Sequence, residues 1–157
     1  MIRVLFVCLG NICRSPAGEG VLRHLAEQEG ILADLTIASC GIGDWHIGHP
    51  PDSRIREAAS QRGISLNTRA KPFVSNYLEE FHYIMVADES VREYLLKIAK
   101  NPEQKAKIYF MTAFAKAYKD LPVPDPYYEG SGAFEHVLDI LEDSCRGLLE
   151  EIKPRLK

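Results

Sequence analysis

One stretch near the N-terminus constrains the fold more than any other, residues 4–16 with the sequence VLFVCLGNICRSP. Residues 2–7 are nearly all apolar, which is typical of a strand buried on both faces of a parallel sheet. Cys8 follows directly, and Arg14 and Ser15 come after five intervening residues. We expect Ser15 to cap a helix, with the following proline at the first helical position. The stretch therefore predicts a strand, a short loop and a helix in immediate succession.

Strand-like and helix-like segments alternate along the rest of the chain. Further strands are expected at residues 35–39, 82–87 and 107–111. Helices with one apolar face are expected at about residues 15–29, 52–62, 90–100 and 134–152, with a short helix within 74–81. The helix at 90–100 is expected to end at the step Asn101-Pro102. This alternation predicts an α/β, doubly wound, flavodoxin-like fold of three layers, in which helices cover both faces of a four-stranded parallel sheet. Ligands bind beyond the carboxyl ends of such strands, where Cys8 is expected.

The length and net charge of the chain limit its number of domains and the kinds of partner that it is expected to bind. At 157 residues the chain is expected to form one domain, residues 1–157. A net charge of −3 gives no electrostatic reason to expect nucleic acid or an anionic membrane as partner. The chain has no apolar run of membrane-spanning length and no signal-peptide pattern, so a cytoplasmic protein is expected.

The cysteines and histidines do not form a metal-binding pattern. The chain has four cysteines, at Cys8, Cys13, Cys40 and Cys145. Without a signal peptide they are best interpreted as thiols, and a structural zinc site needs a second close pair that is missing. His46 and His49 are spaced like a ligand pair, but exposed loop histidines are the commoner explanation. Cys145 lies on the apolar stripe of the last helix and is expected in the core.

The spacing of Cys8 and Arg14 suits chemistry on a dianionic oxyanion. A tight loop that opens a helix can direct several backbone N–H groups at a phosphate. Gly10 and Asn11 tolerate the left-handed backbone that a curled loop requires. Arg14 can bind two oxygens with its planar fork, and the same donors favour the thiolate form of Cys8. The Ser15 hydroxyl is close enough in sequence to donate to that sulfur, a role that competes with helix capping.

A thiolate that attacks a phosphate ester needs a proton donor for the leaving oxygen. The candidate is Asp125, which lies in the segment VPDPYYE at residues 123–129. The flanking prolines restrict the backbone and lack the N–H groups that would otherwise stabilise the carboxylate. An Asp-Pro step is also a common turn, but beside the Cys8 loop the acid is the favoured interpretation.

The chain resembles the low molecular weight protein tyrosine phosphatase family over nearly its whole length. The resemblance rests on VCLGNICRSP at residues 7–16, SCGIGDWHIG at 39–48, ADES at 87–90 and DPYY at 125–128. It implies a four-stranded parallel sheet with flanking helices. It also implies hydrolysis of phosphotyrosine and other aryl phosphate monoesters through a phosphocysteine, with no cofactor or metal.

The resemblance assigns roles to individual positions. Cys8 matches the nucleophile, Arg14 the phosphate-binding arginine and Asp125 the general acid. Cys13 matches a second loop cysteine that can form a reversible disulfide with the nucleophile. The remaining matches are the phosphate-loop residues Leu9, Gly10, Asn11, Ile12 and Ser15, the supporting residues Ser39 and Asp88, and the ring-binding residues Trp45, Tyr127 and Tyr128.

Two positions depart from the family pattern. Thr68 stands where many members have a histidine that supports the loop, and Val91 stands where members often have asparagine. Both departures concern the network behind the loop and not the residues that would touch a phosphate.

The expected partners are a phosphotyrosine-containing protein or a small aryl phosphate, with inorganic phosphate as product and inhibitor of a monomeric enzyme. One alternative is an arsenate reductase on the same fold, which would need further cysteines after the third strand, and none lies between Ile84 and Ser144. Another alternative is a redox-sensing phosphotyrosine-binding module without turnover, against which the acid at Asp125 argues. A purely structural α/β domain would leave the Cys8 loop unexplained.

Overall fold

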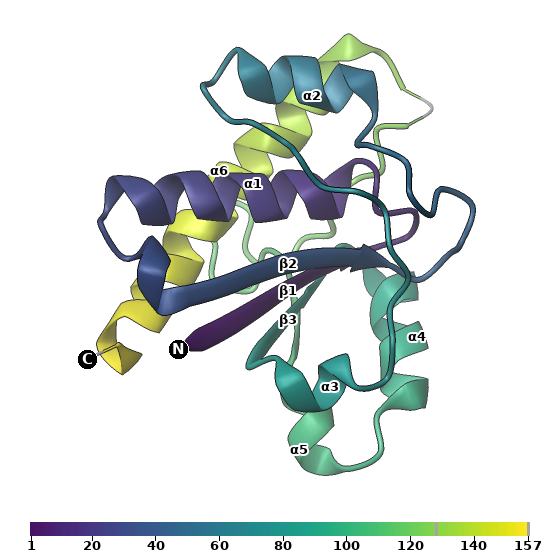
Figure 1. Ribbon diagram of the computed structural model, residues 1–157, viewed down its shortest axis with the longest axis vertical. Coiled ribbons are helices and arrows are strands. Elements are labelled where there is room, and N and C mark those ends of the chain that lie inside the picture. Colours follow the sequence, from purple (N-terminus) through teal and green to yellow (C-terminus); the bar gives the residue numbers. More distant parts are fainter. Residues whose placement is uncertain (128, 157) are drawn as a thin grey trace.

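The sheet is four-stranded and entirely parallel, with the strand order β2-β1-β3-β4 (Figure 1). The computed structural model describes residues 1–127 and 129–156. The strands are β1 (Ile2–Cys8), β2 (Leu35–Gly41), β3 (Tyr83–Val86) and β4 (Ile108–Phe110). The α/β class and the parallel sheet predicted from the alternation of segments are confirmed.

Register places the carboxyl ends of the strands along one edge. Cys8 pairs with Gly41 of β2, and its neighbour Val7 pairs with Val86 of β3. Chain order reverses on the two sides of β1, so the end of β1 is the switch point at which such sheets bind ligands. The sheet therefore presents Cys8 at the position where a ligand is expected.

Helices cover both faces of the sheet (Figure 1). The helices are α1 (Arg14–Gln28), α2 (Ser53–Ser60), α3 (Tyr77–Glu80), α4 (Glu89–Ile98), α5 (Pro102–Lys105) and α6 (Ser131–Ile152), with 3-10 turns η1 (Leu32–Asp34) and η2 (Lys153–Arg155). One face carries α1 and α6, with α2 packed on α6, and the other carries α3, α4 and α5.

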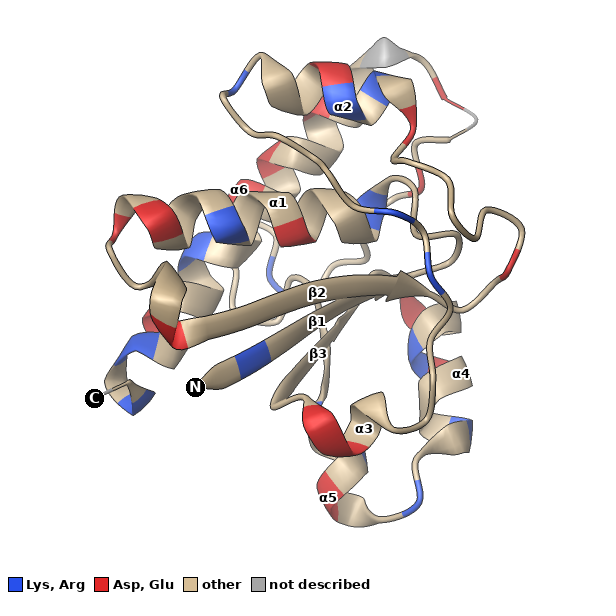
Figure 2. Cartoon of the chain, viewed as in Figure 1, with Lys and Arg blue, Asp and Glu red and all other residues tan. Residues whose placement is uncertain are grey.

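Alternate residues of β1 belong to two separate apolar cores. Val4 and Phe6 pack with α1, α2 and α6, whereas Leu5 and Val7 pack with α3 and α4. All four side chains are at most 1% exposed. Charged residues lie mainly on the helices and loops and almost none on the strands (Figure 2). Within residues 1–127 and 129–156, no helix has the length and apolarity needed to cross a membrane.

Two segments differ from the sequence-based expectation. α4 ends at Ile98, before the Asn-Pro step as expected, but the step also starts a helix that the sequence did not predict, because the Asn101 side chain accepts a hydrogen bond from Gln104 N and caps α5. Residues 112–119, an ambiguous segment in the sequence, form turns held against α6, where the Asp143 carboxylate accepts hydrogen bonds from three successive backbone N–H groups. In both places a side chain competes successfully for backbone donors.

The close approach of these turns to α6 generates a prediction about Gly147. A Cβ atom at this position would overlap the carbonyl oxygen of Phe114, whereas one at Gly132 in the same helix would meet nothing within 4 Å. Replacing glycine by alanine inside a helix normally stabilises it by about 1 kcal/mol. We expect Gly147→Ala instead to lower the free energy of unfolding by roughly 1–3 kcal/mol, since the overlap must be relieved by moving backbone.

Urea unfolding followed by circular dichroism measures this effect. The matched control is Gly132→Ala, which is expected to leave the stability unchanged or slightly higher. Equal behaviour of the two variants would contradict the proposed contact between α6 and the 112–119 turns.

Candidate active site

Cys8 is the last residue of β1, and its sulfur lies among hydrogen-bond donors. The Ser15 hydroxyl oxygen is 2.9 Å from Cys8 Sγ, and the backbone N–H of Asn11 donates to the sulfur at 3.3 Å. The residue is only 2% exposed, but it lines a pocket. Donors directed at a sulfur favour its anionic form, which is the nucleophilic form of a cysteine.

The loop after Cys8 has its carbonyl groups bound from outside. Cys8 O accepts from Ile42 N at 3.0 Å, Leu9 O from Gly43 N at 2.8 Å, and Ile12 O from Asp52 N at 2.8 Å. In a planar trans peptide the N–H points opposite to the C=O. Peptides whose oxygens face the neighbouring segments therefore turn their N–H groups toward the inside of the loop, as an anion cradle requires.

Asn11 holds the loop in this shape. Its backbone is left-handed, with φ of 57°, and the residue is 1% exposed. Its side-chain amide donates to Ser15 Oγ at 2.7 Å and to Ser39 Oγ at 3.1 Å, and its carbonyl oxygen accepts from Lys71 N at 3.0 Å. One side chain thus connects α1, β2 and the 67–71 segment, which offsets the strain of a left-handed backbone.

Ser15 does not cap the helix, so the sequence-based expectation is wrong. It lies inside α1, whose N-cap residue is Cys13, and the Cys13 side chain makes no capping hydrogen bond. The Ser15 hydroxyl faces Cys8 Sγ and also lies 3.2 Å from Cys40 O. Because Asn11 already donates to its oxygen, the single hydroxyl proton is available to the sulfur or to that carbonyl. The hydroxyl is therefore not used for capping, and it lies within hydrogen-bonding distance of both the sulfur and the Cys40 carbonyl.

Arg14 is buried behind the loop and held by two acceptors. Its Nη1 donates to Asp88 Oδ2 at 2.7 Å and to the carbonyl of Val123 at 3.0 Å, while Nη2 lies 3.6 Å from Asp125 Oδ2. Burial alone would lower the pKa of Arg14, but the charges of Cys8, Asp88 and Asp125 raise it. The guanidinium therefore keeps its charge at 3% exposure.

Asp88 orients Arg14 and also caps α4. Its Oδ1 accepts from Val91 N at 3.1 Å and from Ser90 Oγ at 2.8 Å, which leaves Oδ2 for Arg14. Burial would raise the pKa of Asp88, but the hydrogen bonds from Arg14, Ser90 and Val91 lower it below its ordinary value. Asp88 is thus a fixed carboxylate that aims the guanidinium.

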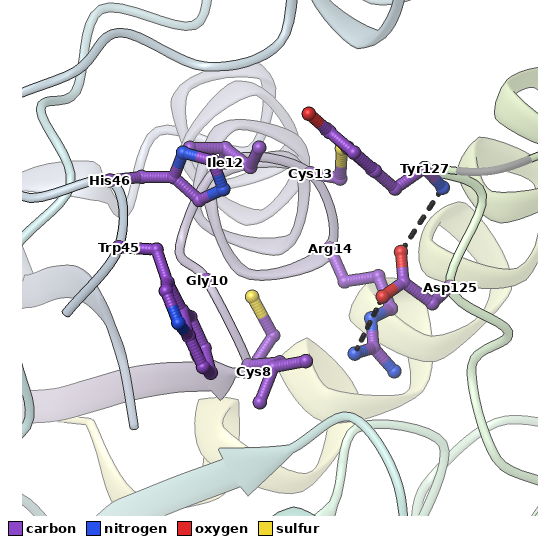
Figure 3. A pocket seen from close by; sticks show the side chains of 10 residues that line it. Cys8, Gly10, Ile12, Cys13, Arg14, Trp45, His46, Asp125 and Tyr127 are labelled. Carbon is purple, nitrogen blue, oxygen red and sulfur yellow. Dashed lines mark hydrogen bonds and ion pairs between the residues drawn. The ribbon is translucent and has the colours of Figure 1, made fainter. Parts of the chain in front are cut away.

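Asp125 reaches the same pocket from the loop before α6. Its Oδ1 accepts a hydrogen bond from Tyr127 N at 3.1 Å, and Oδ2 faces Arg14 (Figure 3). The expectation that the flanking prolines deprive this carboxylate of backbone donors is therefore wrong, since Tyr127, one residue beyond Pro126, supplies one. One oxygen is anchored, and the other points toward the pocket with the side chain 38% exposed.

The pocket has a volume of about 350 Å³ and contains all three predicted catalytic residues (Figure 3). Trp45 and Tyr127 stand on opposite sides of it in this view. Its lining residues are Cys8, Leu9, Gly10, Ile12, Cys13, Arg14, Trp45, His46, Asp125 and Tyr127. Asn11, Ser15, Ser39 and Asp88 lie behind this lining, and Tyr128 falls outside the described residues.

His46 belongs to the pocket, a place that sequence reasoning missed. Its ring lies 6.1 Å from the ring of Tyr127 and 5.7 Å from that of His49, which is exposed. A Cβ atom at Gly10 would come within 3.0 Å of the His46 ring, so the missing side chain there lets the imidazole approach the loop. The adjacency of His46 to Trp45 was the available signal.

The other thiols lie in different surroundings from Cys8. Burial, followed by the charges of Asp52, Cys8 and Asp125, raises the pKa of Cys13 well above its ordinary value. Burial likewise raises the pKa of Cys40 and of Cys145, the latter on the core side of α6 as predicted. In the part of the chain that the structure describes, no group of three or more His, Cys, Asp or Glu side chains is placed to hold a metal ion.

The two departures from the family pattern have different consequences. Thr68 Oγ1 is buried without a hydrogen-bonding partner among the described residues, so its hydroxyl does not support the loop. The same segment supports Asn11 through the backbone N–H of Lys71 instead. Val91 is fully buried in the core under α4, and its backbone N–H still contributes to fixing Asp88.

Comparison with known proteins identifies the family. The family model described as low molecular weight phosphotyrosine protein phosphatase matches residues 3–157. The low molecular weight protein-tyrosine-phosphatase YfkJ of Bacillus subtilis is 38% identical over 155 residues, covering 98% of this chain and 97% of that protein. A protein tyrosine phosphatase from Entamoeba histolytica, crystallised with Hepes in the active site, superposes with a TM-score of 0.94 at 36% identity over 99% of both chains.

A second similar structure contains a phosphonate. Wzb of Vibrio vulnificus in complex with benzylphosphonate superposes with a TM-score of 0.82 at 27% identity, covering 96% of this chain and 98% of that one. Full-length agreement in sequence and in fold leaves one assignment: the chain belongs to the low molecular weight phosphotyrosine protein phosphatase family.

Proposed function

We propose that this chain hydrolyses phosphotyrosine and other aryl phosphate monoesters through a phosphocysteine intermediate. The observation that carries the proposal is the meeting of Cys8, Arg14 and Asp125 at one pocket, although Asp125 lies more than a hundred positions along the chain from the other two. A sulfur nucleophile, a fixed cation and a carboxyl group with one oxygen facing the cation are the groups that such a reaction requires.

In the first step the Cys8 thiolate attacks phosphorus and the bond from phosphorus to the aryl oxygen breaks. Asp125 in its acid form donates the proton to that oxygen, which leaves as a phenol. The Ser15 hydroxyl is placed to stabilise the thiolate before attack and the departing sulfur later. Hydrolysis of phosphate monoesters is extremely slow without a catalyst, so preorganised charge must supply most of the acceleration.

The phosphocysteine is held by the loop N–H groups and by Arg14. Because Nη1 is bound to Asp88 and Val123, we assign the Nε and Nη2 edge of the guanidinium to two phosphate oxygens. In the second step water attacks phosphorus, the Asp125 carboxylate accepts its proton, and the sulfur leaves with the bonding electrons. Inorganic phosphate is released and, as a ligand of the same cradle, inhibits the enzyme.

The pocket walls favour an aromatic ester. Trp45 is 65% exposed and lies at the mouth, where its ring packs over Gly43, and Leu9 adds a second apolar side chain at 38% exposure. We expect a phosphotyrosine to place its ring against this rim with its phosphate at Cys8, whereas a phosphoserine side chain is shorter. The phosphonate bound to Wzb likewise carries an aromatic ring.

The proposed partners are therefore a phosphotyrosine-bearing protein or a small aryl phosphate, acted on by a monomer.

All four cysteines are free and buried, and a reducing compartment such as the cytoplasm would keep them so. Cys13 and Cys8 both line the pocket, which supports a reversible disulfide between them after oxidation. An arsenate reductase is disfavoured because Cys145, the one cysteine after β3, contacts Gly18 O in the core.

The nucleophile assignment is tested by Cys8→Ser. We expect turnover of p-nitrophenyl phosphate to fall by about 10⁴-fold or more, because a hydroxyl is a far weaker nucleophile at neutral pH. EDTA is expected to leave the wild-type rate unchanged. Cys145→Ala, which removes a thiol remote from the pocket, is the control and should keep its turnover per folded molecule. Near-wild-type activity of Cys8→Ser would refute the assignment.

The acid assignment is tested by Asp125→Ala with two leaving groups. We expect kcat/KM to fall roughly 10²–10⁴-fold for phenyl phosphate, whose leaving group needs a proton. For 2,4-dinitrophenyl phosphate the loss should be small, since that phenolate leaves without protonation. Steady-state kinetics at several pH values measure both. An equal loss for the two substrates would mean that Asp125 does not protonate the leaving group.

The aromatic wall is tested with matched phosphopeptides. We expect the wild type to prefer phosphotyrosine over phosphoserine, and Trp45→Ala to lower kcat/KM for phosphotyrosine by about tenfold, the scale of one aromatic contact. Ile47→Ala is the control, because Ile47 is exposed in the same loop but is not among the pocket-lining residues. Comparable turnover of the two phosphopeptides by the wild type would rule out the aryl preference.

A further inference from the structure

Arg54, at the start of α2, contacts the loop that carries Asp125. Its Nη2 donates to the carbonyl oxygen of Tyr127 at 2.9 Å. Its guanidinium carbon lies 5.4 Å from the centre of the Tyr127 ring and 4.7 Å from that of Phe134 in α6. A hydrogen bond and two cation–π contacts thus join one side chain to both ends of the segment that links Asp125 to α6.

We propose that Arg54 is a positioning residue for the general acid, an inference that rests on the proposed function. Tyr127 is held on both sides of its backbone: its N–H donates to Asp125 Oδ1, and its carbonyl accepts from Arg54. Fixing this residue fixes the donor that anchors the Asp125 carboxylate. Arg54 itself is absent from the residues that line the pocket, so it acts through Tyr127 and not on the substrate.

Asp52 holds Arg54 in place and connects it to the phosphate loop. Its carboxylate accepts from Arg54 Nε at 3.0 Å and Nη2 at 2.9 Å, and from the Arg54 backbone N–H at 2.9 Å, which caps α2. The hydrogen bonds from Arg54 lower the pKa of Asp52 against the effect of its burial. The backbone N–H of Asp52 in turn donates to Ile12 O at 2.8 Å.

A continuous path therefore runs from the phosphate loop to the acid loop. It passes from Ile12 through Asp52 and Arg54 to Tyr127 and Asp125. The two halves of the site come from distant parts of the chain, and this path sets their separation. Misplacement of a catalytic group by about 1 Å can cost about a hundredfold in rate, so such a connection has a measurable effect.

The planar fork of arginine suits this position better than the charge alone. Arg54 binds Asp52 through two nitrogens and Tyr127 O through one of them while its flat face lies over two rings. A lysine would keep the charge but cannot reproduce the fork or the stacking. A positioning role thus predicts that lysine fails to replace arginine, whereas a purely electrostatic role predicts that it succeeds.

The experiment compares kcat/KM for phenyl phosphate and 2,4-dinitrophenyl phosphate in Arg54→Ala and Arg54→Lys. Because kcat/KM includes only steps up to expulsion of the leaving group, it isolates the acid step. We expect a loss of roughly 10- to 100-fold with phenyl phosphate in both variants and about threefold or less with the dinitrophenyl ester. The inhibition constant of inorganic phosphate should change by less than about threefold, since the cradle and Arg14 are untouched.

The matched control is Arg56→Ala in the same helix. Arg56 is exposed, its Nε donates to Pro51 O, and its charge, like that of Arg54, lowers the pKa of Asp52, so this variant removes a comparable charge and keeps the hydrogen bonds of Arg54. It should leave the dependence on the leaving group unchanged. Full activity of Arg54→Lys, or equal losses for the two substrates in Arg54→Ala, would overturn the positioning role.

A double-mutant cycle shows whether Arg54 acts through Asp125. If it does, Arg54→Ala should cause almost no further loss with phenyl phosphate once Asp125→Ala is present. Multiplication of the two losses would show an independent effect and refute the inference.

Hydrogen exchange separates failure of this inference from failure of the proposed function. In Arg54→Ala, peptides that span residues 121–134 should exchange faster than in the wild type and in Arg56→Ala, whatever the substrate. If the wild type does not hydrolyse aryl phosphates, the proposed function fails. The exchange measurement then tests the structural role of Arg54 by itself, and unchanged exchange of these peptides in Arg54→Ala would refute that role. If the wild type is active and exchange is unchanged, only the positioning inference fails.

Discussion

The structure depends on one constraint, that a seven-residue loop from Cys8 to Arg14 must turn its backbone N–H groups inward. A peptide cannot do so unless its carbonyl finds a donor on the outside. The donors come from residues 42 and 43 after β2 and from Asp52 before α2. The segment that connects β2 to α2 therefore supplies the donors for the carbonyls on the outer side of the loop. With these carbonyls hydrogen-bonded on the outside, the backbone N–H groups on the inside form the phosphate-binding surface.

Asn11 supports the loop through its side chain. A left-handed residue buried at the centre of the loop is unfavourable by itself, and three hydrogen bonds to α1, β2 and the 67–71 segment compensate. Two of these partners, Ser15 and Ser39, are themselves buried, at 0% and 3% exposure. The sheet thus contributes to the chemistry indirectly, by fixing the ends of the elements that hold Asn11. In this arrangement the Ser15 hydroxyl is positioned for the sulfur and not for its own helix.

Arg14 joins the two halves of the site. It emerges from the first turn of α1, is aimed by Asp88 at the end of β3, and meets Asp125 from the loop before α6. One buried cation between carboxylates keeps its charge and brings the acid loop toward the sulfur. The cost of burying the charge is offset by the acceptors around it. The Asp52–Arg54 pair at the start of α2 reaches the acid loop from its other side, so two arginines flank it.

The sequence by itself determined the parallel α/β sheet, the cysteine at the end of β1 and the three groups that meet in the pocket. Apolar periodicity and the spacing from Cys8 to Arg14 are local, and local patterns can be seen in one chain. Only the tertiary structure decided that Ser15 faces the sulfur, that Tyr127 anchors the Asp125 carboxylate and that His46 lines the pocket. Each of these outcomes depends on partners between two and several tens of residues away, chosen by competition among donors and acceptors that become neighbours only after folding. The role of Arg54 is of the same kind, since its partner Tyr127 is 73 positions distant in the chain.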